Sequence, residues 1–230
     1  MTHKRLSDIV FIIQSRINSK RIPGKMLRPF ADSTLFEIAL EKILASSLIP
    51  NENFYVSLYD DVLKDIAREK GINIYHRSEK SVSESSDTRV VSEWHNKLDY
   101  SYFVSINPCC PLLQVATIEN FVRHYLDSPY PGAFGVRRVQ NFYWDHEGKL
   151  ITTYPGTLDT KCVEATFEGA HCLYAGSMDR IGQGIYLGNF EPNDPELYQI
   201  EEKETFDIDY EWQFRAAEVL YKNKDYVLND

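Results

Sequence analysis

The segment DIVFIIQSRINSKRIPGKMLR, residues 8–28, joins an apolar run to a loop rich in cations. The run over residues 8–14 is short, continuous and partly β-branched, which is typical of a strand buried on both faces of a parallel sheet. No aspartate or glutamate occurs between Asp8 and Asp32. The basic residues of the loop are Arg16, Lys20, Arg21, Lys25 and Arg28. Since ligands of open α/β sheets bind beyond the carboxyl ends of the strands, the loop predicts a phosphate site, although a solvated loop without a ligand explains the same charges.

Strand-like and helix-like patterns alternate along the rest of the chain. Apolar runs predict further strands over residues 53–59, 72–77, 102–107 and 133–139. Helical spacing of apolar residues predicts helices over residues 35–46, 62–71, 87–98, 116–126 and 210–224, and FDID at 206–209 reads as strand-like. The alternation predicts an α/β fold with a mostly parallel, Rossmann-like sheet and helices on both faces.

The pattern changes between residues 140 and 188. Aromatic residues, glycine and threonine are frequent there, and short alternating runs predict antiparallel strands. We interpret residues 1–230 as a single domain and residues 140–188 as a small antiparallel insertion or dimerisation arm.

Composition excludes several classes of protein. The chain of 230 residues is 43% hydrophobic and 26% charged, which is ordinary for a soluble globular protein. Its net charge of -9 argues against general nucleic-acid binding. No run approaches the roughly 18 apolar residues of a membrane span. The four cysteines form no CxxC pair, so we expect a reduced, cytoplasmic protein.

The basic loop carries neither common nucleotide fingerprint, GxxxxGK[ST] or GxGxxG. Its sequence IIQSRINSKRIPGKML instead resembles the nucleotide-binding loop of the cytidylyltransferases that make CMP-linked acidic sugars, whose pattern is roughly A-R-x-G-S-K-x-x-x-x-K-N. The matching positions are Arg16, Ser19, Lys20, Pro23, Gly24 and Lys25. The family includes acylneuraminate cytidylyltransferases, CMP-3-deoxy-octulosonate synthetases and spore-coat polysaccharide proteins, and the resemblance extends along most of the chain.

The resemblance implies a nucleotidyltransferase that joins CMP from CTP to the anomeric hydroxyl of an acidic sugar and releases pyrophosphate. It implies that Arg16 and Lys25 are catalytic and grip the triphosphate. It also places Ser15, Ser19 and Lys20 among the nucleotide-binding residues. The implied partners are CTP, an acidic sugar and a second copy of the chain, with no nucleic acid and no membrane.

The loop departs from the family pattern at two positions. Asn18 stands where the family has glycine, which predicts that this loop curves differently or crowds the phosphates. Met26 stands where acylneuraminate enzymes have an asparagine that contacts cytosine, so strict selection of CTP does not follow.

Two carboxylates near the end of the chain predict a metal site. Asp207 and Asp209 are two residues apart, so on an extended segment both side chains face the same way. Paired hard oxygen donors suit Mg²⁺ or Mn²⁺, although Asp209 could instead cap the helix that follows. The acylneuraminate enzymes carry a D-x-D before a closing helix, and the resemblance implies that this pair holds the metal.

The segment HRSEKSVSESSDTRVV, residues 76–91, resembles a family segment that lies near the nucleotide. It implies that Arg77, Ser86 and Asp87 bind the nucleotide. An exposed loop with a helix cap at Ser86 or Asp87 explains the same residues nearly as well.

Two further segments resemble the sugar pocket of the family. NPCCPLL resembles the QPTSPL segment of the acylneuraminate branch, which places Asn107 beside the sugar. EATFEGAHCLYAG resembles strands that complete the pocket, where Glu168, His171 and Tyr174 could lie. A structural role for His171 remains the simpler interpretation.

Other interpretations stay open. The acceptor could be sialic acid, legionaminic or pseudaminic acid, 3-deoxy-octulosonate or a phosphonate. A nucleotide-sugar glycosyltransferase also uses a D-x-D motif, but usually at a central strand. A non-catalytic nucleotide-binding relative is the third alternative, because of the changes at Asn18 and Met26.

Overall fold

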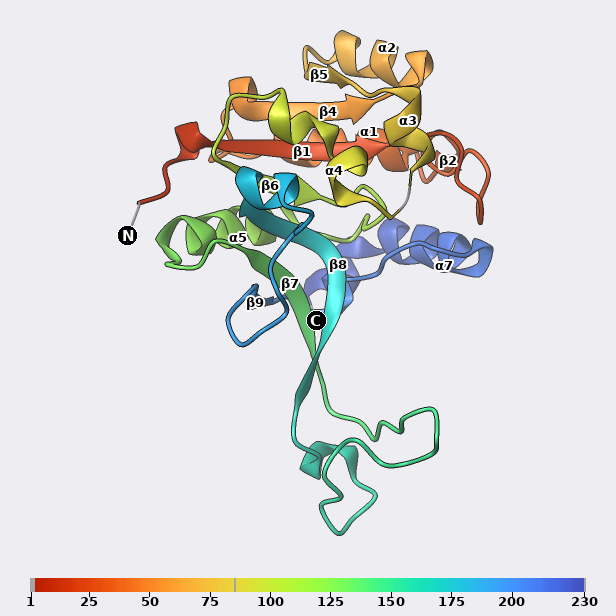
Figure 1. Cartoon of the computed structure of the whole chain (residues 1–230). Coiled ribbons are helices and arrows are strands. Elements are labelled where there is room, and N and C mark those ends of the chain that lie inside the picture. Colours follow the sequence, from red (N-terminus) through yellow and green to blue (C-terminus); the bar gives the residue numbers. More distant parts are fainter. Residues whose placement is uncertain (1–2, 85, 230) are drawn as a thin grey trace.

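The computed structural model describes residues 3–84 and 86–229. In this part of the chain the centre is a seven-stranded sheet in the order β5-β4-β1-β6-β8-β7-β9 (Figure 1). Its strands are β1 (Ile9–Ser15), β4 (Phe54–Leu58), β5 (Asn73–His76), β6 (Tyr102–Ile106), β7 (Ala133–Val139), β8 (Thr166–Ser177) and β9 (Glu196–Gln199). β8 pairs antiparallel with β6 and β7, and the other neighbouring strands pair in parallel. The predicted mostly parallel α/β sheet is therefore confirmed.

The remaining elements flank this sheet. A two-residue hairpin, β2 (Pro29–Phe30) and β3 (Ser33–Thr34), follows the basic loop. The α-helices are α1 (Leu35–Leu44), α2 (Asp61–Glu69), α3 (Glu79–Ser83), α4 (Thr88–Val91), α5 (Val115–Asp127), α6 (Met178–Gly182), α7 (Glu211–Lys222) and α8 (Lys224–Asn229). The 3-10 turns are η1 (Leu6–Asp8), η2 (Asn51–Asn53), η3 (Glu93–Asn96), η4 (Thr160–Cys162) and η5 (Glu202–Glu204). Among the described residues, no helix is both long and apolar enough to span a bilayer.

The strand β1 is buried on both faces, as its continuous apolar sequence predicts. Phe11 and Ile13 belong to the larger core, which α1, α5 and α7 cover. Val10 and Ile12 point the other way, into a smaller core that includes Trp94 of η3 and residues of α6. This burial fixes β1 in the middle of the sheet and places the loop after it at the carboxyl edge.

Two sequence predictions differ from the structure, and one strand was not predicted. Residues 87–98 form two short elements, α4 and η3, in place of one helix, because the chain turns at Ser92 and buries Trp94 against Phe103. Residues 206–209 form no strand, since the N–H of Ile208 donates to a loop carbonyl, at Cys109 (3.1 Å). The strand β9, which pairs with β7, was not predicted, because it has only four residues and none of them is buried.

The region between residues 140 and 188 contributes to the sheet as well as to an arm. β8 is one long strand inside the central sheet, with β6 and β7 on either side. The chain between β7 and β8, coloured green to teal, projects away from the sheet (Figure 1). Exposed apolar side chains lie on this arm, including Trp144 (59% exposed) and Leu158 (81% exposed).

Candidate nucleotide-binding site

The basic loop leaves the carboxyl end of β1 and is fixed at both of its ends. The N–H of Ile17 donates to the Asp60 carboxylate (3.0 Å), which follows the neighbouring strand β4. Gly24 has φ +68°, in the left-handed region that glycine adopts without strain. Its carbonyl accepts from the N–H groups of Leu27 (2.9 Å) and Arg28 (3.0 Å). The loop is therefore a defined turn that holds Lys25 against the protein.

A pocket of about 360 Å³ lies between this loop and the loop after β6. Its lining residues are Gln14, Ser15, Arg16, Ser19, Lys20, Arg21, Lys25, Met26, Asn107, Pro108 and Cys109. These described lining residues include four cations and no carboxylate. Because the chain as a whole is acidic, the pocket concentrates positive charge locally and suits a polyanion such as a triphosphate.

The tail of the chain contacts the basic loop through three cations of that loop. Lys25, only 9% exposed, donates through Nζ to the carbonyl of Ile208. Arg21 pairs with Asp209 (2.7 Å between Nη2 and Oδ1). Arg28 pairs with Glu211 (2.6 Å) at the start of α7. The basic loop and the predicted metal carboxylates, far apart in sequence, therefore meet at the same edge of the sheet.

The carboxylates Asp207 and Asp209 lie beside the end of β6. Asn107 donates through Nδ2 to Asp207 Oδ1 (3.3 Å) and to the carbonyl of His171 (2.8 Å). Burial raises the pKa of Asp207, and the neighbouring charge of Asp209 acts in the same direction. Two carboxylates that repel each other fit a divalent cation, which relieves that repulsion. Among the described residues no set of three His, Cys, Asp or Glu gathers, so an ion here needs water or phosphate oxygens as well.

A second cavity of about 360 Å³ adjoins the first through shared residues, Gln14, Asn107 and Pro108. The described residues that line it are uncharged, and they include Ser86, Ser92, Ser105, Tyr174 and Tyr186. Hydroxyl and amide groups can bind the edges of a base or the hydroxyls of a sugar. The two cavities together offer one charged and one neutral compartment around the loop after β6.

His171 lies at an irregularity of β8. The register between β7 and β8 shifts between Phe134 and Val136, and His171 has φ +55°. This conformation is unusual for a residue with a side chain and is often found at functional sites. Its Nδ1 lies 3.0 Å from the hydroxyl of Tyr174, and its charge acts to lower the pKa of Asp207. The bulge thus brings His171 toward the tail carboxylates.

Three predicted site residues make other contacts. Arg77 is buried and donates to the hydroxyl (3.0 Å) and the carbonyl (2.8 Å) of Ser81. Asp87 accepts from the N–H of Arg89 (3.0 Å) and caps α4, as the alternative interpretation expects. Glu168 pairs with Arg137 across β7 and β8 (2.9 Å). None of the three is among the described residues lining either cavity.

Arg77 nevertheless supports the site indirectly. Burial lowers the pKa of Arg77 to about 10, and the nearby charge of Arg16 adds to that effect. Its bonds to Ser81 order the short helix α3, and the carbonyl of Val82 in α3 accepts from Arg16 (2.7 Å). Arg77 therefore helps to set the position of Arg16.

Sequence reasoning missed several lining residues. Gln14 is the polar residue at the end of an apolar strand, and its Oε1 accepts from the indole N–H of Trp94. Cys109 lines the charged pocket, and burial raises its pKa to about 11, so it stays a thiol at neutral pH. Met26, which the sequence had already marked as a departure from the family pattern, also lines the charged pocket; it is 4% exposed and its sulfur lies 3.8 Å from the hydroxyl of Ser15. A position of that kind cannot offer the polar contact to cytosine that an asparagine would make.

Comparison with known proteins gives one family. Residues 10–170 match the family model of the cytidylyltransferases. Over 83 residues the chain is 31% identical to the spore coat polysaccharide biosynthesis protein SpsF of Bacillus subtilis. That match covers 34% of this chain and 35% of SpsF, so it spans about a third of that relative.

Solved structures share the fold at low identity. A CMP:2-keto-3-deoxy-manno-octonic acid synthetase complexed with CTP matches with a TM-score of 0.69 at 14% identity, covering 95% of this chain and 100% of that one. A cytidylyltransferase from Leptospira borgpetersenii gives 0.61 at 15% identity, covering 96% and 94%. A 4-diphosphocytidyl-2C-methyl-D-erythritol synthase from Anaerococcus prevotii gives 0.66 at 11% identity, covering 93% and 96%.

Proposed function

The chain belongs to the cytidylyltransferase family, enzymes that use CTP, and from this premise we propose that it joins CMP to the anomeric hydroxyl of an acidic sugar, sialic acid or a related nonulosonic acid, and releases pyrophosphate. The observation that carries the proposal is the meeting of a cationic pocket with two carboxylates from the tail. A triphosphate binds to cationic side chains and its metal counter-cation to carboxylates, so both kinds of charge must lie at one place.

In the proposed reaction the sugar hydroxyl attacks the α-phosphorus of CTP in line and pyrophosphate leaves. Catalysis of this kind depends mainly on positioning and on neutralising charge. Arg16 and Lys25 hold the leaving pyrophosphate, with Ser15, Ser19 and Lys20 around it. Arg16 is pre-positioned by its bond to Val82, and Lys25 by its bond to Ile208, so little reorganisation is needed when the nucleotide binds.

We propose that Asp207 and Asp209 hold Mg²⁺ or Mn²⁺. Such an ion supplies electrostatic shielding of the phosphate oxygens. Asp209 pairs with Arg21 in the structure, so holding an ion would require it to release that guanidinium, which could then bind a phosphate oxygen. The structure therefore supports a coupled role for these two residues.

The two neighbouring compartments suit the two substrates. The nucleoside fits the neutral cavity on its Ser86 side, and the sugar fits beside Asn107, His171 and Tyr174. His171 can offer an N–H to the acidic group of the sugar. 3-Deoxy-octulosonate, legionaminic acid or a phosphonate would make the same contacts, so the acceptor is defined here only as acidic.

A homodimer is the other proposal inherited from the family. The arm between β7 and β8 exposes Trp144 and Leu158, which a second arm could cover. Sedimentation of the chain and of a Trp144→Ser, Leu158→Ser variant tests this, because only the first should sediment as a dimer.

The function is tested by a pyrophosphate-release screen of the four nucleoside triphosphates against a panel of acidic sugars, with Mg²⁺ present. We expect release that requires both CTP and one of the acidic sugars. The proposal would be contradicted if none of the four triphosphates gave pyrophosphate release with any of the sugars. Transfer from a ready-made CMP-sugar to an acceptor, with CMP liberated, would instead indicate a glycosyltransferase, and CTP binding without turnover a non-catalytic relative.

A further inference from the structure

Gln14 is a polar residue near the end of β1, and its side chain reaches the candidate site. Of the seven residues of this strand, all of which the structure describes, Gln14 alone is half-buried and the others are buried. It lines both the charged pocket and the neutral cavity, as Asn107 and Pro108 do. The side chain of Gln14 therefore lies at the junction of the two compartments.

The indole of Trp94 sets the direction of the Gln14 amide. Its N–H donates to Oε1 of Gln14, and its ring is fully buried against Phe103 (5.4 Å between ring centroids). An indole nitrogen donates and does not accept, so the amide oxygen must face Trp94 and the amide NH2 group must point away from it. The two N–H donors of Gln14 are thus held in a fixed direction.

These two donors have no acceptor within residues 3–84 and 86–229, which the structure describes. Ser57 is the in-register neighbour of Gln14 on β4, but its buried hydroxyl has no hydrogen-bond partner in the same ranges. Polar groups inside proteins are nearly always hydrogen-bonded, to the protein, to water or to a ligand. Because Gln14 lines two cavities, its donors are open to a bound molecule.

Asn107 is the other side-chain amide at this junction, and its groups are already engaged. Its Nδ2 donates to the carbonyl of His171 (2.8 Å) and to the carboxylate of Asp207 (3.3 Å), and its Oδ1 accepts from the N–H of Cys109 (2.9 Å). Both N–H groups of the Asn107 amide are therefore used within the protein. Gln14 is left as the amide that can donate to a ligand here.

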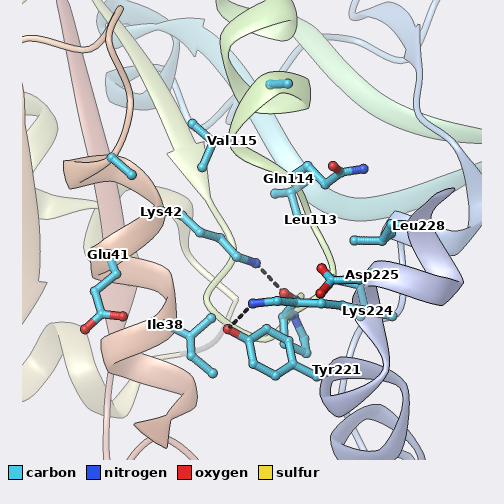
Figure 2. Close-up of a pocket in the computed structure, with 14 residues that line it drawn as sticks. Ile38, Glu41, Lys42, Leu113, Gln114, Val115, Tyr221, Lys224, Asp225 and Leu228 are labelled. Carbon is cyan, nitrogen blue, oxygen red and sulfur yellow. Dashed lines mark hydrogen bonds between the residues drawn. The ribbon is translucent and has the colours of Figure 1, made fainter. Parts of the chain in front are cut away.

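The loop after β6 forms the other side of the junction and is held from behind. Lys42 of α1 lines a separate cavity of about 470 Å³ (Figure 2), and its Nζ donates to the carbonyls of Cys110 (3.0 Å) and Pro111 (2.6 Å) in this loop. Since Gln14 is held as well, the junction is fixed before a ligand binds. Donors fixed in advance stabilise a developing charge without the cost of rearrangement.

We propose that Gln14 is a catalytic residue that donates a hydrogen bond to a non-bridging oxygen of the α-phosphate of CTP, an assignment that rests on the proposed function. With the β- and γ-phosphates among the cations of one compartment and the nucleoside in the other, the α-phosphate between them lies beside Gln14. An uncharged donor is thereby placed at the phosphorus atom where bonds change.

Gln14 stabilises charge in this step and transfers no proton. As the sugar oxygen bonds to the α-phosphorus, the bond from this phosphorus to the bridging oxygen breaks, and its electron pair leaves with pyrophosphate. The hydroxyl proton of the sugar passes to solvent. Negative charge is spread over the non-bridging oxygens in the transition state, and the N–H of Gln14 stabilises it there.

Calorimetry with CMP and with cytidine tests the contact without turnover, because CMP carries the α-phosphate and cytidine does not. Gln14→Met removes the donors, and we expect it to weaken binding of CMP about tenfold and to leave binding of cytidine unchanged. Gln183→Glu is the control and should change neither affinity, since Gln183 is exposed at the end of α6 and lines neither cavity.

The contact is overturned if Gln14→Met binds CMP as the wild type does, if the folded variant loses affinity equally for both ligands, or if the wild type does not bind CMP. Gln14→Glu keeps an oxygen for the N–H of Trp94 while it removes the donors. If urea unfolding shows that Gln14→Met does not fold, the same outcomes are read from Gln14→Glu.

Pyrophosphate release from CTP tests the catalytic role separately, with the acidic sugar found by the screen. We expect Gln14→Met to lower kcat by about 10². The fall should be smaller with one of the two diastereomers of CTP that carry a sulfur on the α-phosphorus, because sulfur accepts hydrogen bonds poorly. Equal falls with CTP and with both diastereomers would overturn the contact.

The two experiments separate this inference from the proposed function. Binding of CMP that depends on Gln14, without turnover on any sugar, would count against the proposed function and support the contact. Turnover of CTP that is the same in the wild type and in Gln14→Met would overturn the role of Gln14 and leave the proposed function intact.

Discussion

Replacing Lys25 with methionine tests how the basic loop and the tail act together. Methionine keeps most of the apolar stem of lysine but removes its charge and its hydrogen bond to the carbonyl of Ile208. In the proposed reaction Lys25 neutralises charge on the leaving pyrophosphate. We therefore expect kcat/KM for CTP to fall by roughly 10²–10³, the size of effect seen when one preorganised donor to a developing anion is removed.

The fold should survive this change. The carbonyl of Ile208 loses its Lys25 donor, which costs about 1–3 kcal/mol for a buried acceptor. A domain of this kind has about 5–15 kcal/mol of stability, so the variant remains mostly folded at 25 °C. The loop also keeps its tether from Ile17 to Asp60 and its pair between Arg28 and Glu211.

The assay is pyrophosphate release with CTP and the acidic sugar found by the screen, combined with urea unfolding of the same samples. Lys64→Met is the control, because Lys64 pairs with Asp61 on α2 and does not line the charged pocket. A wild-type kcat/KM in Lys25→Met would refute the assigned role. A loss of activity that merely followed the unfolded fraction would refute it equally.

Three more outcomes are expected. Asp209→Ala should lower CTP-dependent pyrophosphate release by about 10² or more and raise the Mg²⁺ concentration needed. Asp65→Ala, which removes a carboxylate paired with Arg68 on α2, should affect neither, and equal losses in both variants would remove the metal assignment. Hydrogen bonds from donors that follow α1 hold the pKa of Glu119 at about 2, below its ordinary 4.5, so its contribution to stability is present above about pH 4.5 and is lost as the pH falls toward 2. In urea unfolding, the free energy of unfolding should therefore fall less over that pH range in Glu119→Gln than in the wild type. Parallel falls in the two proteins would contradict this. Gly176→Ala places a Cβ 2.7 Å from the ring of Phe103 and should lower the unfolding free energy by about 1–3 kcal/mol, whereas an unchanged midpoint in urea would show that the ring moves aside.

Local patterns were enough to predict the centre of the fold. The apolar run before the basic loop could only be a strand covered on both faces, and the structure buries it so. Ser33 and Thr34 both carry hydroxyls that suit a helix cap, and Thr34 caps α1 by accepting from the N–H of Glu37 (3.2 Å). These features depend on residues within a few positions of one another, which is why sequence alone identifies them.

Long-range pairing explains what sequence reasoning missed. The bulge that exposes His171 exists only because β8 pairs with β7, and the ion pair of Glu168 with Arg137 has the same origin. Asp207 lies close enough to Asp209 for that charge to help raise its pKa, but the strand expected around the two residues does not form, because Ile208 bonds to the loop after β6. The helix cap at Asp87 could be predicted from the sequence, because it is a contact between residues two positions apart. It was the alternative to a nucleotide-binding role for this residue.

The most direct test of the account is a crystal structure of this chain with CTP and Mg²⁺. The account predicts the triphosphate between Arg16 and Lys25, with the ion bound by Asp207 and Asp209 and the pair between Arg21 and Asp209 opened. A triphosphate bound elsewhere, or an ion that touches neither carboxylate, would contradict it.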